Sequence, residues 1–392
     1  MALAPEVWEP KPTSPICKQH CCVIRQRPRA AGYDNLQKCC KTGSDGKSIV
    51  INSGGGYNRV DWYCQIKARE LGAITVAMAT GFSTDTSGSV STDQEPRVTA
   101  LDDGIEAVDL SWRTGTEIRG LDLRDPDAIP ESTIENLTRL VSERCFLLFR
   151  NQLLDHDQHL AFTRRLGWLA KTGMIDRYAP PGYPDIYRVT NMVIDGARSE
   201  VWDAARQWHS DQSFMLEPAM GSLLRCEIAP RLGGNTMWAN MYLGYERLSD
   251  GLKKVLAPLR ARHSVTNGKS QKSERVKKPY EAGTEVLAGT VHPVVRTHPI
   301  TRRKCLYISE MFVESFEGWT VEESAPLLNY LNAFATQPAF TYRHAWKPGD
   351  LVFWDNRCTL HCAPEDYDVT QLDAPENHRL MYRTTLAGTI PF

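Results

Sequence analysis

Residues 206–214 read RQWHSDQSF and place His209 and Asp211 two positions apart, between aromatic side chains. In an extended chain, side chains at i and i+2 point to the same face, so an imidazole nitrogen and a carboxylate oxygen can converge on one point. This arrangement indicates half of a metal site. The remaining ligand is expected elsewhere in the chain.

Short runs typical of β-strands follow from residue 185 onward, bounded by Gly, Pro or Asn. They are DIYRVTN, SLLRCEIAP, NTMWAN, RKCLYISE, DLVFWDN and RLMYRTTLAG. Helical periodicity is present in PESTIENLTRLVSERC and HDQHLAFTRRLG before these runs, and a further helix is expected at EESAPLLNYLNAFA. The pattern predicts a mainly β fold with flanking helices, a sandwich or jelly roll with room inside for a small molecule.

The composition is that of an ordinary globular protein. The 392 residues are 42% hydrophobic and 24% charged, with a formal net charge of -1. This balance does not favour binding to nucleic acid or to an anionic membrane. The start of the chain lacks the apolar core of a secretion signal, and the run GAITVAMATGF is too short to span a bilayer. We therefore expect a cytoplasmic protein with no membrane or nucleic-acid partner.

The cysteines suggest that the N-terminal part is separate. Six of the 11 cysteines fall in the first 64 residues: Cys17, Cys21, Cys22, Cys39, Cys40 and Cys64. Their spacing lacks the paired C-x2-C motifs of common zinc sites, so free thiols are favoured over zinc or disulfides. Residues 83–97, STDTSGSVSTDQEPR, are typical of a linker. We predict a cysteine-containing extension and linker over residues 1–97 and one domain over residues 98–392.

His361 is the best candidate for the missing ligand because it follows an apolar strand, 351–354, and a polar turn. Two histidines and one carboxylate form the facial triad of non-heme iron(II) oxygenases, which leaves coordination positions open. If 2-oxoglutarate and O2 fill those positions, the distal carboxylate of 2-oxoglutarate needs a cation. Arg379 and Arg383 are four residues apart on one strand face, and arginine binds carboxylates through a bidentate fork. Position alone leaves open that both arginines lie on the surface.

Together these residues resemble the iron(II)/2-oxoglutarate dioxygenases of the taurine dioxygenase and 2,4-dichlorophenoxyacetate dioxygenase type. The matching motifs run in order from about residue 105 to the C-terminus: GTEIRGLDL, FLLFRNQLLDHDQHLAFTRRLG, WHSDQSF, GGNTMWANMYLGYERL, HPVVRTHP, WKPGDLVFWDNRCTLH and HRLMYRTTLAG. The resemblance implies a double-stranded β-helix, commonly in an oligomer.

The resemblance also implies roles for individual residues. His209, Asp211 and His361 would bind iron(II), and Arg379 with Thr236 of the GGNT motif would hold the distal carboxylate of 2-oxoglutarate. Arg383 matches a second arginine near the iron, which meets an anionic substrate or the C1 end of 2-oxoglutarate. Trp354 matches an aromatic residue beside the site, although a role as plain core is equally compatible with its position.

The implied function is hydroxylation of a small organic, anionic substrate, with release of succinate and CO2. Desaturation or ring formation in natural-product biosynthesis is an alternative, and a catalytically silent β-barrel binding module is disfavoured by the intact site residues. DAARQW replaces the asparagine-bearing stretch of taurine enzymes, which argues against a taurine pocket. The step of 18 residues from His361 to Arg379 predicts an inserted loop, DYDVTQLDAPEN, near the mouth of the site.

Overall fold

The structure is a computed structural model that describes residues 96–170 except 103, then 178–199, 204–265 and 289–392, together with three strands nearer the N-terminus. The chain divides into two compact units, Met1–Val90 and Ser91–Phe392. In the first unit, β1 (Lys38–Lys41), β2 (Ser48–Asn52) and β3 (Tyr63–Gln65) form an antiparallel sheet in that order. The hypothesis about thiols or zinc in this unit lies outside the described residues.

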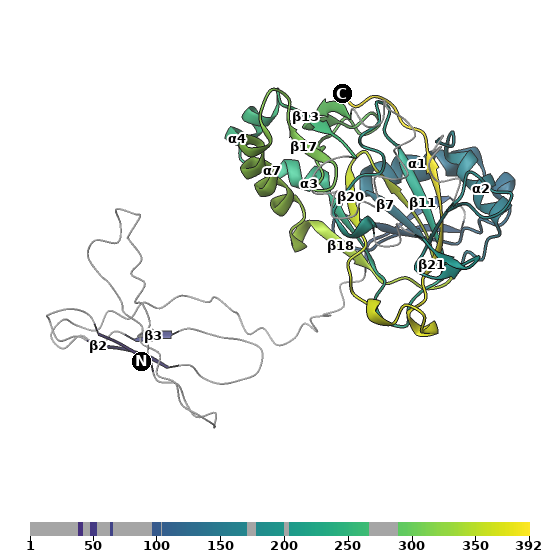
Figure 1. Cartoon of the computed structure of the whole chain (residues 1–392), viewed down its shortest axis with the longest axis horizontal. Coiled ribbons are helices and arrows are strands. Elements are labelled where there is room, and N and C mark those ends of the chain that lie inside the picture. The colour runs from purple at the N-terminus through teal and green to yellow at the C-terminus, as the bar shows by residue number, and fades with distance from the viewer. Residues whose placement is uncertain are drawn as a thin grey trace, which may run out of the picture. The chain divides into compact units, whose positions relative to one another are not determined.

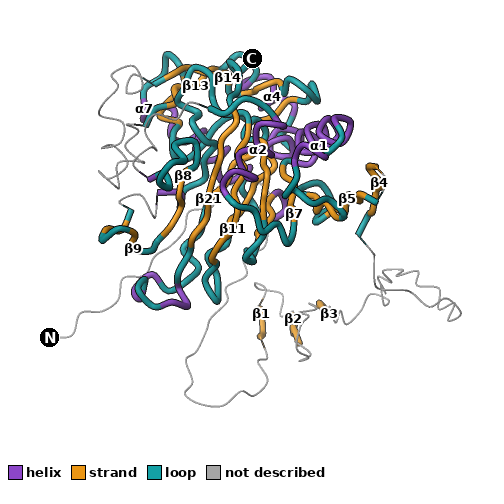
Figure 2. The backbone as a smooth tube through the Cα atoms, turned by 90° about the vertical axis from the view of Figure 1, so that its right-hand side faces the viewer, coloured by secondary structure: helices purple, strands orange, loops and turns teal. Residues whose placement is uncertain are grey.

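An eight-stranded sheet dominates the second unit, with the order β4-β5-β6-β7-β19-β11-β21-β8. The pair β6–β7 is parallel, and the other neighbours are antiparallel. Figure 2 shows β8, β21 and β11 running side by side. The strands are β4 (Val98–Asp102), β5 (Ile105–Asp109), β6 (Thr116–Arg119), β7 (Phe146–Phe149), β8 (Tyr187–Thr190), β11 (Gly221–Ile228), β19 (Leu351–Asp355) and β21 (Leu380–Leu386).

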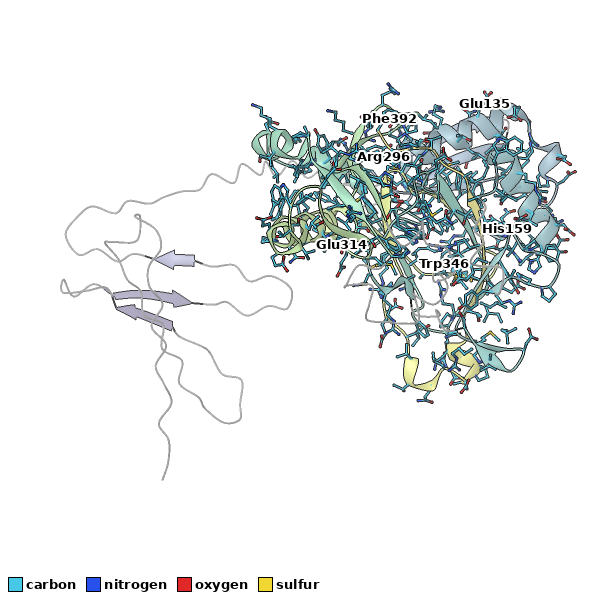
Figure 3. The ribbon with its side chains drawn as sticks, turned by 45° about the horizontal axis from the view of Figure 1, so that its top comes forward. Glu135, His159, Arg296, Glu314, Trp346 and Phe392 are labelled. Carbon is cyan, nitrogen blue, oxygen red and sulfur yellow. The ribbon has the colours of Figure 1, made fainter. Side chains whose placement is uncertain are left out.

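Two amphipathic helices, α1 (Glu131–Arg144) and α2 (His156–Leu166), pack on this sheet. Glu135 of α1 and His159 of α2 are labelled in Figure 3. A capping box starts α2: Asp155 accepts from the Gln158 amide, and the Gln158 side chain accepts from the Asp155 amide. The apolar faces of the helices are buried in one core cluster with the sheet, where each large aliphatic side chain contributes about 1.5–3 kcal/mol.

Smaller sheets and further helices complete the unit, and Figure 1 shows α3, α4 and α7 grouped away from α1 and α2. The sheets have the orders β18-β12-β20, β14-β13-β17, β15-β16 and β10-β9. Their strands are β9 (Val193–Ile194), β10 (Ala197–Arg198), β12 (Thr236–Asn240), β13 (Arg260–His263), β14 (Thr290–Pro293), β15 (Val295–Thr297), β16 (Lys304–Leu306), β17 (Val313–Phe316), β18 (Thr341–His344) and β20 (Thr359–Cys362). The helices are α3 (Met241–Glu246), α4 (Asp250–Leu256) and α7 (Val321–Ala335), with short 3-10 helices at Pro126–Ala128, Ala204–Arg206, Pro338–Phe340, Val369–Gln371 and Pro375–Asn377.

A core of aromatic rings joins the large sheet to the β18-β12-β20 sheet. Trp238 of β12 stacks on Phe146 of β7, with 4.7 Å between ring centroids, and lies 5.9 Å from the ring of Trp354 on β19. All three side chains are buried. Because this core fixes β12 and β20 against β19, it also fixes the strand that carries His361.

The predicted elements are confirmed. The three predicted helices correspond to α1, α2 and α7, and the six predicted runs contain β8, β11, β12, β16, β19 and β21. The mainly β fold with flanking helices is therefore correct. Among the described residues, no helix is both long enough and apolar enough to cross a membrane.

Candidate functional site

The backbone brings His209 and His361 together, although they are far apart in the sequence. His361 lies on β20, and His209 forms an isolated antiparallel bridge with it. The His209 amide donates to the His361 carbonyl at 3.0 Å, and the His361 amide donates back at 2.8 Å. The two imidazole ring centroids are 4.1 Å apart. The chain thus presents both rings on one side of the bridge.

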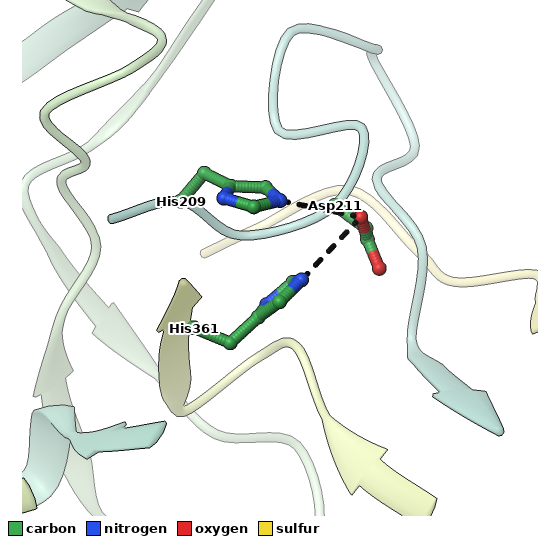
Figure 4. Close-up of side chains that lie close together, drawn as sticks. All are labelled: His209, Asp211 and His361. Atoms are coloured by element: carbon green, nitrogen blue, oxygen red, sulfur yellow. Dashed lines mark ion pairs between the residues drawn. The ribbon is translucent and has the colours of Figure 1, made fainter. Parts of the chain in front are cut away.

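Asp211 completes the group that the sequence predicts. Its Oδ1 atom lies 3.8 Å from Nε2 of His209 and 3.8 Å from Nε2 of His361. One potential ligand atom from each of the three residues lies within 4.8 Å of the other two. Figure 4 shows both ring nitrogens directed at the carboxylate. Each residue is only 5% exposed, so the group is buried.

The histidines are held in the neutral form that binds metal ions. Burial lowers the pKa of His209, and it lowers the pKa of His361 well below its ordinary value of 6.5. Nδ1 of His209 lies 2.8 Å from the Gln207 carbonyl, so this nitrogen donates and Nε2 keeps its lone pair. Nε2 is the nitrogen that faces Asp211 in both histidines, so the Nε2 atoms are the expected metal ligands.

Asp211 stays charged despite its burial. Burial alone would raise its pKa, but the charge of Arg383 and the hydrogen bond from Ser222 oppose this, and the net result is a pKa below the ordinary value of 3.8. Arg383 Nη1 donates to Oδ1 at 2.9 Å, and Ser222 Oγ donates to Oδ2 at 2.8 Å. Two neutral imidazoles and one carboxylate on one side of a point fit iron(II) and leave the other side open for co-substrates.

A second group of potential ligands is not suited to bind a metal ion. It consists of His298, Asp355 and Cys358. Nδ1 of His298 accepts from the amides of Ile300 and Thr301, so Nε2 must donate to Asp355, at 3.0 Å. His298 therefore has no lone pair left for a metal ion. The Asp355 carboxylate is also occupied by the guanidinium of Arg357. This group is a structural hydrogen-bond network.

Arg379 lies just before β21 and is 7% exposed. Its Nε donates to the Gly234 carbonyl at 3.2 Å, and it forms no ion pair with any residue in the described ranges. Burial lowers the pKa of this guanidinium, since no paired carboxylate compensates for the lost water. A buried, unpaired arginine is suited to an incoming carboxylate.

The GGNT turn packs against Arg379 and leads into Thr236, the first residue of β12. Gly233 and Gly234 have φ angles of +76° and +65°, which favour glycine, and a Cβ on Gly234 would lie 3.6 Å from Cδ of Arg379. Thr236 Oγ1 accepts from the Trp346 indole at 2.9 Å, which leaves its own proton to donate. Trp346 is labelled in Figure 3.

The predicted insertion holds this turn. Asp366 Oδ1 accepts from the Gly234 amide at 2.7 Å and from the Asn235 amide at 3.3 Å. Tyr367, the next residue, receives a hydrogen bond of 3.4 Å from Asn191, whose Oδ1 accepts from the Arg379 amide. Asp366 and Tyr367, at the start of the predicted loop, thus border the arginine that we expect to bind 2-oxoglutarate.

Sequence reasoning missed Ser222, Asn356 and Gln207, which orient the predicted ligands. It also left the role of Trp354 open, and the structure gives that residue two roles. The Trp354 ring is 4.8 Å from the His361 ring, and its indole donates to Asn356 Oδ1 at 2.9 Å. One sequence signal could have pointed to Asn356. It lies between Asp355 and Arg357 in the polar turn after the strand at 351–355, where an asparagine is well placed for local hydrogen bonds.

Comparisons with known proteins show the family of this chain. Residues 106–385 match the family described as "Taurine catabolism dioxygenase TauD, TfdA family". An alpha-ketoglutarate-dependent 2,4-dichlorophenoxyacetate dioxygenase from Burkholderia sp. (strain RASC) is 36% identical over 253 residues, which is 62% of this chain and 84% of the relative. An alpha-ketoglutarate-dependent sulfate ester dioxygenase from Pseudomonas putida is 32% identical over 292 residues, which is 72% of this chain and 89% of the relative.

Solved structures show the same likeness. A taurine dioxygenase from Burkholderia xenovorans has 34% identity and a TM-score of 0.59, covering 74% of this chain and 92% of that one. The structure of AAD-2 in complex with Mn(II) and N-oxalylglycine has 31% identity and a TM-score of 0.60, covering 73% and 98%.

The fold and site therefore define an oxidoreductase of the 2-oxoglutarate-dependent dioxygenase class. The chain belongs to the TauD/TfdA family. Its cofactor is iron(II), and 2-oxoglutarate and O2 are its co-substrates, as predicted. Its substrate is a small organic molecule.

Proposed function

We propose that His209, Asp211 and His361 bind the iron(II) of this dioxygenase. The observation that carries the proposal is the approach of Nε2 of His209 and Nε2 of His361 to the same oxygen, Oδ1 of Asp211, each at 3.8 Å. Neutral imidazoles and an ionised carboxylate are the donors that this metal takes in such sites. The bridge between the two histidines holds the donors in place before the metal binds.

Arg379 and Thr236 are proposed to hold the distal carboxylate of 2-oxoglutarate. Arg379 offers a buried guanidinium with no ion pair to any described residue, and Thr236 offers a hydroxyl proton. Iron(II) held by His209, Asp211 and His361 would supply the O2 chemistry that converts 2-oxoglutarate to succinate and CO2 and adds one oxygen atom to the substrate. The work of the protein is to orient 2-oxoglutarate and to keep its carboxylate paired in a buried place.

The substrate is proposed to be a small organic anion, above all a carboxylate, that is hydroxylated. Phe214, Val265, Met311 and Phe312 form a buried apolar cluster, and the Phe312 ring lies 6.0 Å from the His209 ring. Arg383 also borders the site, because it donates a hydrogen bond to Asp211. An apolar wall and a guanidinium beside one metal site suit a molecule with an apolar body and a negative group.

The names of the relatives are compatible with this chemistry. Those named for 2,4-dichlorophenoxyacetate, sulfate esters and (S)-phenoxypropionate act on compounds that carry an acidic group. A relative named pentalenolactone F synthase, from Streptomyces arenae, is 35% identical over 221 residues. Because this relative is named as a synthase, desaturation or ring formation in biosynthesis is the second candidate outcome of the same cofactor chemistry.

We also propose that the two β layers form the double-stranded β-helix, or jelly roll, of this family, and that residues 98–392 are the catalytic domain. The aromatic core between β7, β12 and β19 supports the first proposal. The separate contacts of Ser91–Phe392 support the second. A homo-oligomer stays a prediction.

The test is succinate release from 2-oxoglutarate by anaerobically purified protein after addition of iron(II) and O2. Phenoxyalkanoates, sulfate esters and neutral analogues of the same size should be compared as substrates. We expect at least one anionic compound to stimulate succinate release and to gain a hydroxyl group. The substrate proposal would be overturned if the protein binds iron(II) and releases succinate with a neutral compound but with no anionic compound.

A further inference from the structure

Asn356 lies directly after β19, in a turn that is anchored on both sides. The Asp355 carboxylate accepts from the backbone and the side chain of Arg357, and the Asp355 amide donates to the Cys145 carbonyl at 2.9 Å. The Asn356 amide donates to the Met220 carbonyl, also at 2.9 Å. The backbone of Asn356 is therefore fixed independently of its side chain.

The side chain of Asn356 is 1% exposed and makes three hydrogen bonds. Its Oδ1 accepts from the Trp354 indole at 2.9 Å and from the Asp211 amide at 3.3 Å. Its Nδ2 donates to Ser222 Oγ at 3.2 Å. An indole N–H and a backbone N–H can only donate, so the carbonyl end of the side-chain amide must face Trp354 and Asp211.

That orientation decides what Ser222 does. Nδ2 of Asn356 can only donate, so Ser222 Oγ accepts from it and has its single proton left for another partner. The partner is Oδ2 of Asp211, at 2.8 Å. Asn356 thus acts on Asp211 at two points: directly at its backbone amide, and through Ser222 at one carboxylate oxygen.

The result is an asymmetric carboxylate. Oδ2 accepts from Ser222 and Oδ1 accepts from Arg383, and Oδ1 is the atom that lies 3.8 Å from both histidine Nε2 atoms. We propose that Asn356 is a positioning residue that fixes the Asp211 carboxylate through Ser222, so that Oδ1 alone binds the metal ion. The inference rests on the proposed binding of iron(II) by His209, Asp211 and His361.

The variants Asn356→Ala and Ser222→Ala test the inference by metal affinity, measured with Mn(II) and with anaerobic iron(II). Loss of a group that orients a ligand weakens metal binding by about 10–100-fold, and we expect this range for both variants. Because the two residues act along one chain of hydrogen bonds, the double variant should bind little more weakly than Asn356→Ala alone. The charge-transfer absorption of the anaerobic iron(II)–2-oxoglutarate complex should also change in each variant.

Asn240→Ala is the matched control. Asn240 is also 1% exposed, and its side chain accepts from the Leu243 amide and donates to the Arg113 carbonyl, away from the metal ligands. Its loss should lower thermal stability while leaving metal affinity within about threefold, a difference under 1 kcal/mol. If Asn356→Ala does not fold, Ser222→Ala, which leaves the bond from Trp354 to Asn356 in place, carries the test.

The wild-type protein is measured first, so that the two proposals fail separately. A wild-type protein that binds neither Mn(II) nor iron(II) contradicts the proposed metal site itself. The positioning role is contradicted if the wild-type protein binds metal and the metal affinities of Ser222→Ala and of any folded Asn356→Ala lie within about twofold of the wild-type value. In that case the charge-transfer absorption of the variants would also be unchanged.

Discussion

Arg383 donates from Nη1 to Oδ1 of Asp211 at 2.9 Å, and this is the carboxylate oxygen that faces both histidines. The arginine therefore balances the charge of the ligand before a metal ion is bound. The sequence left open which anion pairs with Arg383. The ion pair answers part of that question, because a guanidinium inside the domain needs an anion and Asp211 is one. Any substrate contact must use the remainder of the Arg383 guanidinium, whose Nε has no hydrogen-bond partner among the residues that the structure describes.

Arg383→Ala should raise the apparent KM for an anionic substrate by about tenfold or more, equivalent to at least ~1.4 kcal/mol, and uncouple O2 use from product formation. Affinity for 2-oxoglutarate should stay nearly intact because we propose that Arg379 holds its distal carboxylate. Steady-state kinetics with matched anionic and neutral substrates measure this. If the variant loses 2-oxoglutarate binding and treats both substrates alike, Arg383 serves the C1 end of 2-oxoglutarate instead.

Arg379→Ala should weaken binding of 2-oxoglutarate by roughly 30-fold or more, since truncating one partner of a buried ion pair costs about 2–5 kcal/mol. Titration of the metal-loaded, anaerobic protein measures the affinity. Arg225→Gln is a suitable control because Arg225 is 4% exposed and pairs with Glu227 on the same strand. A change below about threefold for Arg379→Ala would mean that this arginine does not bind the co-substrate.

A protein that begins at Ser91 should fold and consume 2-oxoglutarate at a rate close to that of the full chain. The second unit has its own core clusters, and β4 pairs with β5 inside it. Circular dichroism and succinate release check the two parts of this prediction. Insoluble protein, or soluble protein that binds metal but turns over no 2-oxoglutarate, would show that residues 1–90 contribute to the fold or the site.

Stability should fall as the pH drops below 6.5, because burial lowers the pKa of His159 to about 3 and that of His292 to about 4. Between those values and 6.5 the unfolded state takes up protons that the folded state does not, at about 1.4 kcal/mol per pH unit and group. His159 lies on α2, with Nε2 3.2 Å from Thr384 Oγ1. Denaturant unfolding of His159→Gln should show a shallower decline between pH 6 and pH 4 than the wild type; parallel curves would refute this account.

The positions of helices and strands could be predicted from the sequence, but the pairing of the strands could not. Helical periodicity and short apolar runs are local signals, so α1, α2 and β19 could be located directly. Their arrangement is not local: β11 lies between β19 and β21, and its Ser222 is paired with Trp354 far along the chain. No residue pattern within either strand specifies that pairing.

The site shows the same division. His209, Asp211 and His361, which the structure brings together, could be proposed from the sequence because metal ligands need particular residue types at particular spacings. Ser222 and Asn356 escaped because a serine in an apolar strand and an asparagine in a turn are common for purely local reasons. Their effect on Asp211 depends on three-dimensional contacts, with distances of 2.8 Å and 3.3 Å, that the sequence does not encode locally.

Equilibrium binding of iron(II) to the wild-type protein and to Asp211→Ala, under anaerobic conditions, tests the central claim most directly. Asp350→Asn serves as the control, because Asp350 is also a buried carboxylate beside a histidine, with Oδ2 3.0 Å from His344 Nε2. We predict one iron(II) per chain for the wild type and for the control, and a folded Asp211→Ala protein that neither binds iron(II) nor releases succinate. A folded Asp211→Ala protein that binds iron(II) as tightly as the wild type would contradict the assignment of the metal site.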